Sequence, residues 1–198
     1  MGTRHVIFVI EQGEIKVAQY GQWDGDPDST GREILNFLKS VKLEHFRENV
    51  QASSFYTREE LEEIWEFQRK LPGTLPRHVS RDMGSDILWH LMKRPSKLRD
   101  ERQFVTDGCL CEWAYVIDFD TSQFEVYEGF NTEKPCVGRF CDWPRIDTDD
   151  RQWTPATFVK SFHIDDLPDA EVFYRQVMEI ANPEYLTEMD EDNELEKS

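Results

Sequence analysis

The chain has few of the features that mark membrane and secreted proteins. No apolar run among its 198 residues reaches the ~18 that suggest a membrane-spanning helix. The first residues do not form an apolar segment followed by small residues, which a secretory signal requires. We therefore expect a cytoplasmic protein that has no membrane partner.

Cysteine is scarce, with four residues at Cys109, Cys111, Cys136 and Cys141. The C-x₂-C pairs of structural zinc sites are absent, because one residue separates the first two cysteines and four separate the last two. For a chain expected in the cytoplasm, we predict reduced thiols and no bound metal.

Positive charge is also scarce. Lysine and arginine number 23 against 40 acidic residues, which gives a formal net charge of −17. Such a chain repels phosphates, so we expect no nucleic-acid partner. The charge permits a basic partner, although solubility alone also explains it.

Familiar catalytic and cofactor motifs are missing. The sequence has no G-x-S-x-G, no Walker loop, no G-x-G-x-x-G and no H-E-x-x-H. We predict no cofactor, and no pattern specifies an oligomeric state.

The most informative stretch that is present is the start of the chain, residues 3–26. Residues 5–10 are almost wholly apolar and rich in valine and isoleucine, which is typical of a strand buried on both faces. Gly13 allows a tight turn, and alternation from Ile15 onward predicts the second strand of a hairpin.

A polar, aromatic loop follows this hairpin. Two glycines and Pro27 within residues 20–27 predict a shaped loop around Trp23. Trp23 could plug the end of the core while Asp24 caps the turn. Alternatively, the loop contacts a ligand, because it combines a large aromatic, a carboxylate and a carboxamide. On that interpretation the candidate binding residues are Arg4, His5, Tyr20, Gln22, Trp23 and Asp24. A structural role for His5 on its strand stays open.

The rest of the chain separates helical from extended patterns. Helical periodicity and capping signals predict helices at residues 30–50 with a break near Leu43, 57–71, 80–94 and 168–180. Extended patterns predict strands at residues 104–105, 109–119, 124–128, 136–143 and 157–163.

This segregation predicts an α+β fold. We expect a mainly antiparallel sheet, single or as two stacked sheets, covered by a layer of the helices from 30–94. Residues 1–183 would form one domain, and the acidic residues 184–198 a disordered tail. The basic stretch 93–102 could hold an anion or serve as a solvated linker.

Two resemblances bear on function. The opening Met-Gly-Thr-Arg-His and the turn Tyr-Gly-Gln-Trp-Asp-Gly resemble a family of uncharacterised proteins of microbes and their viruses, which implies no activity. The arrangement of strand, glycine turn and loop also resembles N-terminal-nucleophile (Ntn) hydrolases of the proteasome type. That resemblance implies cleavage between Gly2 and Thr3, after which the Thr3 hydroxyl would be the nucleophile and its freed amine the base.

Two hypotheses follow. The first, which we favour, is a non-enzymatic acidic protein that binds a protein or small-molecule ligand through the Trp23 loop. The second is an Ntn-type amide hydrolase with Thr3 as its catalytic residue. They differ in whether Arg4, His5, Gln22 and Asp24 converge on a closed pocket with Thr3 at its floor or lie on an open face.

Overall fold

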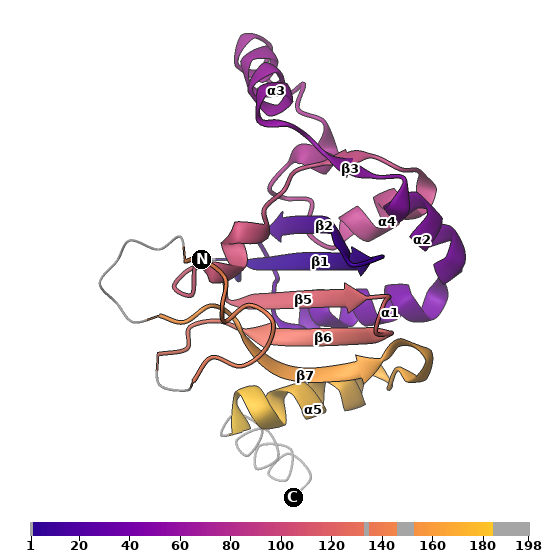
Figure 1. Cartoon of the computed structure of the whole chain (residues 1–198), viewed down its shortest axis with the longest axis vertical. Helices are drawn as coiled ribbons and strands as arrows, with labels where there is room; N and C mark the ends of the chain where they lie inside the picture. The colour runs from indigo at the N-terminus through magenta and orange to yellow at the C-terminus, as the bar shows by residue number, and fades with distance from the viewer. Residues whose placement is uncertain (1, 133–134, 146–152, 184–198) are drawn as a thin grey trace, which may run out of the picture.

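One five-stranded sheet organises the structure, a computed structural model that describes residues 2–132, 135–145 and 153–183. The strand order is β2-β1-β5-β6-β7 (Figure 1). These strands are β1 (His5–Glu11), β2 (Glu14–Gly21), β5 (Trp113–Asp118), β6 (Gln123–Glu128) and β7 (Thr157–His163). Three of the pairings in this sheet are antiparallel, whereas β1 and β5 run parallel. The α+β prediction is confirmed, with one large sheet rather than two stacked ones in the described part of the chain.

The first hairpin forms as its sequence predicts. Gln12 and Gly13 both adopt positive φ, at 56° and 73°, which suits the tight turn between two twisted strands. Strand β1 is central, between β2 and β5, and its apolar residues are buried on both faces of the sheet. Asp120, in the neighbouring turn between β5 and β6, holds this turn, because its carboxylate accepts hydrogen bonds from the Gln12 and Gly13 amides at 2.8 and 2.6 Å.

Helices cover one face of the sheet. They are α1 (Arg32–Ser40), α2 (Leu43–Gln51), α4 (Asp86–Lys93) and α5 (Ala170–Ala181), and their apolar side chains share a core with Ile7, Tyr115 and Phe124. The predicted break near Leu43 is confirmed, since Val41 is extended between α1 and α2. The remaining helix, α3 (Arg58–Lys70), buries no side chain and projects from the body (Figure 1). None of the described helices is both long and apolar enough to span a bilayer.

Loops cover the opposite face. A second core forms there around Val6, Phe8 and Val116, closed by Phe140 and by residues of the helical turn Arg102–Thr106. Other short helical turns lie at Pro27–Gly31, Arg77–Val79 and Ile164–Asp166. A separate parallel pair, β3 (Ser54–Phe55) with β4 (Lys97–Leu98), stands outside the main sheet.

The basic stretch 93–102 is largely neutralised within the chain. Lys97 pairs with Glu60, Arg99 with Glu101, and Arg102 with Asp100. These pairs favour the linker interpretation over an anion site.

Four predicted elements are wrong in extent or kind. The strand expected at 109–119 begins only at Trp113, because the residues before it form a turn in which the Leu110 and Cys111 amides donate to the Asp107 carbonyl. The helix expected at 80–94 begins only at Asp86, because Gly84 at φ +46° interrupts the helical path. The strand expected at 104–105 is a helical turn. The strand expected at 136–143 is a closed turn, since Gly138 has a φ of +102° that an extended strand does not accommodate. The predicted tail at 184–198 lies outside the described residues.

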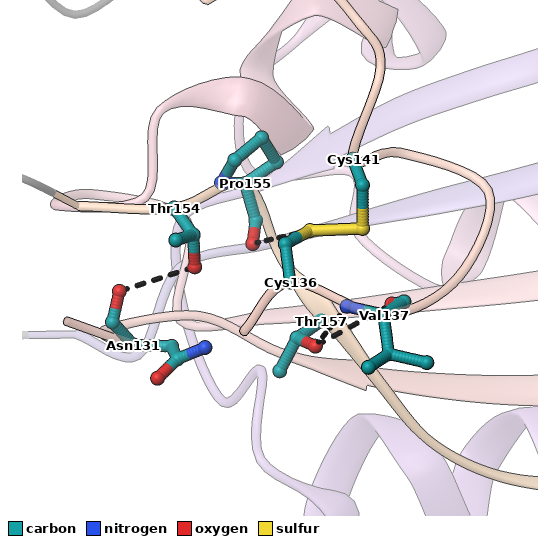
Figure 2. The surroundings of a disulfide bond; sticks show 7 residues. All are labelled: Asn131, Cys136, Val137, Cys141, Thr154, Pro155 and Thr157. Carbon is teal, nitrogen blue, oxygen red and sulfur yellow. Dashed lines mark hydrogen bonds between the residues drawn. A yellow bond between two sulfur atoms is a disulfide. The ribbon is translucent and has the colours of Figure 1, made fainter. Parts of the chain in front are cut away.

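The prediction of four reduced thiols is also wrong. Cys136 and Cys141 form a disulfide (Figure 2), and their Cα atoms are 5.5 Å apart. Cys109 and Cys111 form no disulfide. The bond is a local one that closes the turn around Gly138, a geometry that spacing alone does not reveal. Its base is tied to β7, because the Val137 amide donates to the Thr157 hydroxyl at 2.8 Å (Figure 2). Disulfides are rare in the cytosol, so the cytoplasmic location stays a prediction that this bond opposes.

The disulfide-closed turn inserts Arg139 among buried carboxylates. Its guanidinium donates to Asp118 at 2.8 Å and to both oxygens of Glu125 at 2.5 and 2.9 Å. Tyr127 donates to the same Glu125 carboxylate at 2.7 Å. Burial opposes ionisation of Asp118, yet the bonds from Arg139 and the Thr121 amide outweigh it and lower the pKa of Asp118.

Candidate functional site

The Trp23 loop is held by backbone contacts. The Gly25 amide donates to the Thr3 carbonyl at 3.0 Å, and Thr30 donates to the Asp24 carbonyl through both its amide and its hydroxyl. Asp26 caps the helical turn that follows, accepting from the Asp28 and Ser29 amides. Because the backbone is fixed in this way, the side chains at residues 22–24 are presented by a defined turn.

Trp23 does not plug the core. Its side chain is 54% exposed, and its indole N–H donates to Asp82 at 3.2 Å. The ring packs over Gly2, where an added Cβ would lie 2.1 Å from Cε3. The interpretation that Trp23 plugs the end of the core is therefore wrong. The other interpretation, that Trp23 contacts a ligand, requires an exposed ring, and the ring is exposed.

His5 is enclosed beneath this loop. Its side chain has no exposed surface, and neither ring nitrogen has a hydrogen-bond partner within the described residues. A Cβ at Gly21 would lie 2.2 Å from the ring, and one at Gly25 would lie 2.6 Å from Nδ1. Burial lowers the pKa of His5 to about 4, against weaker opposing effects of the Thr3 carbonyl and the Asp26 carboxylate. His5 is therefore neutral at pH 7.

A cleft of about 260 Å³ lies between the Trp23 loop and the turn before α4. Its lining comprises His5, Gln22, Trp23, Asp24, Thr30, Glu33, Asp82, Met83, Gly84, Ser85 and Asp86. Its size suits one side chain or a small organic group rather than a larger ligand.

The cleft is strongly acidic. Four carboxylates line it, and no lysine or arginine does so within the described residues. Glu33 accepts from the Ser85 hydroxyl, and Asp82 accepts from the Trp23 indole. Among the residues that the structure describes, one of the four forms an ion pair: Asp86 with Arg77, at 2.5 Å, and Arg77 is not part of the lining. The cleft thus favours a cationic group over an anionic one.

Gln22 is oriented by two neighbours. Its side-chain oxygen accepts from the Tyr20 hydroxyl at 2.6 Å and from Arg81 at 2.8 Å. The Arg81 guanidinium also lies over the Tyr20 ring, 5.3 Å from its centroid. Tyr20 is itself buried and supports the cleft without lining it.

The predicted site residues therefore divide into two groups. His5, Gln22, Trp23 and Asp24 meet at the cleft, whereas Thr3, Arg4 and Tyr20 are not among its lining residues. Arg4 is tied to Glu112, whose carboxylate accepts from the Arg4 amide at 3.1 Å. Thr3 as a nucleophile stays a prediction, and its free amine would require loss of Gly2, on which Trp23 packs.

One wall of the cleft was not predicted. It consists of residues 82–86, which the periodicity assigned to the interior of a helix. The polar run around Gly84 was the available signal, because a glycine flanked by aspartate and serine is typical of a turn. Within the described residues no three histidine, cysteine or acidic side chains are grouped to hold a metal ion.

No family model, no curated protein sequence and no solved structure matches this chain.

The close packing of Gly21 against His5 can be tested by mutation. Gly21→Ala should lower the free energy of unfolding by about 1–3 kcal/mol, because the new methyl overlaps the imidazole. Urea denaturation measures the loss. Adding His5→Ala should make the pair less destabilised than the sum of the two single changes. Strict additivity would contradict the contact.

Proposed function

We propose that the chain is a binding protein whose cleft holds a positively charged group. The observation that carries the proposal is the grouping of four carboxylates and an exposed tryptophan around a small cleft that no lysine or arginine lines in the described chain. The group would be a basic side chain of a protein partner or a small organic cation, since both present the same chemistry.

Each part of the cleft has a role in this proposal. The exposed Trp23 face attracts a cation through its ring quadrupole. Asp24 supplies a carboxylate that makes no hydrogen bond or ion pair among the described residues, so it is available to a ligand. His5, buried and neutral beneath the cleft, adds no positive charge that would oppose the bound cation.

The proposal is tested with the acetylated amides of arginine and lysine, using the amide of glutamate as the opposite-charge probe. Binding is followed by nuclear magnetic resonance titration of the indole N–H signals. We expect the two cationic probes to shift the Trp23 signal and the glutamate probe to leave it in place. Equal shifts from all three probes would contradict the proposal.

Trp23→Ala should weaken binding of the arginine probe by about 3–30-fold, the range of a cation–π contact. Stability should change by less than about 0.5 kcal/mol, because the side chain is more than half exposed. Trp89→Ala is the matched control, since Trp89 is 46% exposed and does not line the cleft. Equal weakening by both changes would remove the Trp23 loop from the site.

A further inference from the structure

The Cys136–Cys141 disulfide closes a short loop, since the two cysteines are five positions apart in the sequence. A bond across so few residues restricts the unfolded chain less than a bond across a long loop does, so its contribution to global stability is small. Its main effect is local, on the shape of the turn. The base of this turn is tied to β7 by the hydrogen bond from the Val137 amide to the Thr157 hydroxyl (Figure 2).

Two side chains within this turn reach the interior. Arg139 enters the network of buried carboxylates described above, and Phe140 is only 1% exposed. The Phe140 ring packs against the rings of Phe8 and Tyr127, with centroids 5.1 and 4.7 Å away. The turn therefore carries both the cation of the buried network and an aromatic side chain of the second core.

The disulfide supplies the geometry on which the position of Arg139 depends. Burial disfavours the charged form of this guanidinium, although its hydrogen bonds to Glu125 and Asp118 raise the pKa of Arg139 overall. Ion pairs of this kind offset their desolvation only while the groups are held in good geometry. If the turn were released at one end, water could hydrate the guanidinium and both carboxylates instead.

The disulfide can be reached by a reductant. Cys136 and Cys141 are each partly exposed, whereas the thiol-bearing Cys111 has no exposed surface. Exposed disulfides are reduced more readily than enclosed structural ones, and they are the ones that serve regulation.

We propose that this disulfide is a redox-sensitive switch, whose reduction by a dithiol withdraws Arg139 from the carboxylates and opens the second core around Phe140. One thiolate of the dithiol attacks a sulfur of the bond, which forms a mixed disulfide and releases the other cysteine as a thiolate. The second thiolate of the dithiol then displaces the protein sulfur. Overall, two electrons and two protons pass to the protein, and the dithiol leaves as a cyclic disulfide. No residue of the turn lines the cleft, so the switch does not depend on the proposed cation site.

Cys111 reports on the opening, because it belongs to the same core as Phe140 and is fully buried. The full chain is reduced with dithiothreitol, separated from it and treated with N-ethylmaleimide, and labelling of each cysteine is followed by peptide mass spectrometry. Reduction should speed the labelling of Cys111 at least tenfold, whereas the partly exposed Cys109 should change by less than twofold. Replacing Cys136→Ser together with Cys141→Ser should give the same labelling rates as reduction. If this double variant fails to fold, the reduced natural chain still provides the test.

Titration of the Asp118 carboxyl group by nuclear magnetic resonance is the second measurement. Withdrawal of Arg139 should raise the pKa of Asp118 in the reduced chain, because it removes the hydrogen bond that lowers this pKa most. Unchanged labelling of Cys111 or an unchanged titration of Asp118 would each overturn the proposal. An equal acceleration of amide hydrogen exchange throughout α1 would also overturn it, because reduction would then destabilise the whole domain rather than open the turn.

Discussion

Arg139→Ala should lower the free energy of unfolding by about 3–5 kcal/mol, the cost of leaving buried carboxylates without their partner. The Asp118 and Glu125 side chains are only 5% and 12% exposed, so water cannot replace the guanidinium fully. Urea denaturation at pH 7 measures this loss. The change should also raise the pKa of Asp118, because it removes the Arg139 hydrogen bond, the largest of the effects that lower it.

Two variants control for this result. Arg58→Ala removes a pair whose side chains are 87% and 63% exposed, and it should cost less than about 1 kcal/mol. Arg139→Met combined with Asp118→Asn and Glu125→Gln removes the charges together, and it should recover part of the loss. A triple variant no more stable than Arg139→Ala would show that the carboxylates are not the cause.

Lowering the pH from about 7 to about 4 should cost about 3 kcal/mol through His5 alone. The folded protein disfavours the imidazolium and has a pKa of about 4 for His5, against 6.5 as its ordinary value. The unfolded chain therefore binds this proton first as the pH falls, and stability is lost progressively between these two pH values. Above about pH 6.5 the contribution is complete.

His5→Gln isolates this contribution, because glutamine is polar, similar in size and does not titrate. The quantity to measure is the difference in unfolding free energy between the two proteins at several pH values. Taking this difference removes the contribution of the carboxylates to the pH dependence, because they titrate in both proteins. Parallel stability curves for the two proteins from pH 7 to pH 4 would mean that His5 is not the buried, neutral group described above.

Much of the fold could be predicted because its elements follow local rules. The hairpin around Gly13, the capping box at Thr57 and the alternation in residues 124–128 each depend on neighbours within one element. The failures occur where distant chain segments decide the local conformation. The turn at Gly138 is set by a disulfide and by β7. The late start of α4 is a different kind of failure, because the local turn signal at Gly84 was present and was outweighed by the helical periodicity around it.

Only one wall of the candidate site could be predicted, because the two walls come from separate parts of the chain. His5, Gln22, Trp23 and Asp24 belong to one hairpin and its loop, so sequence proximity indicated their grouping. The opposite wall at residues 82–86 comes from another part of the chain, and no local pattern connects the two. Arg4 was grouped with His5 by sequence, but it precedes β1 and its amide is bound to the Glu112 carboxylate instead.

The parallel pairing of β1 with β5 sets the order in which the chain can fold during synthesis. Strand β2 is available as soon as the first hairpin leaves the ribosome, but the other edge of β1 pairs only with residues from Trp113 onward. At normal elongation rates that wait is on the order of ten seconds. Throughout it, the most apolar strand of the protein has one edge of unpaired amides and carbonyls, which other nascent chains can pair with. The fold therefore needs chaperones most during early translation, and this need ends when β5 emerges.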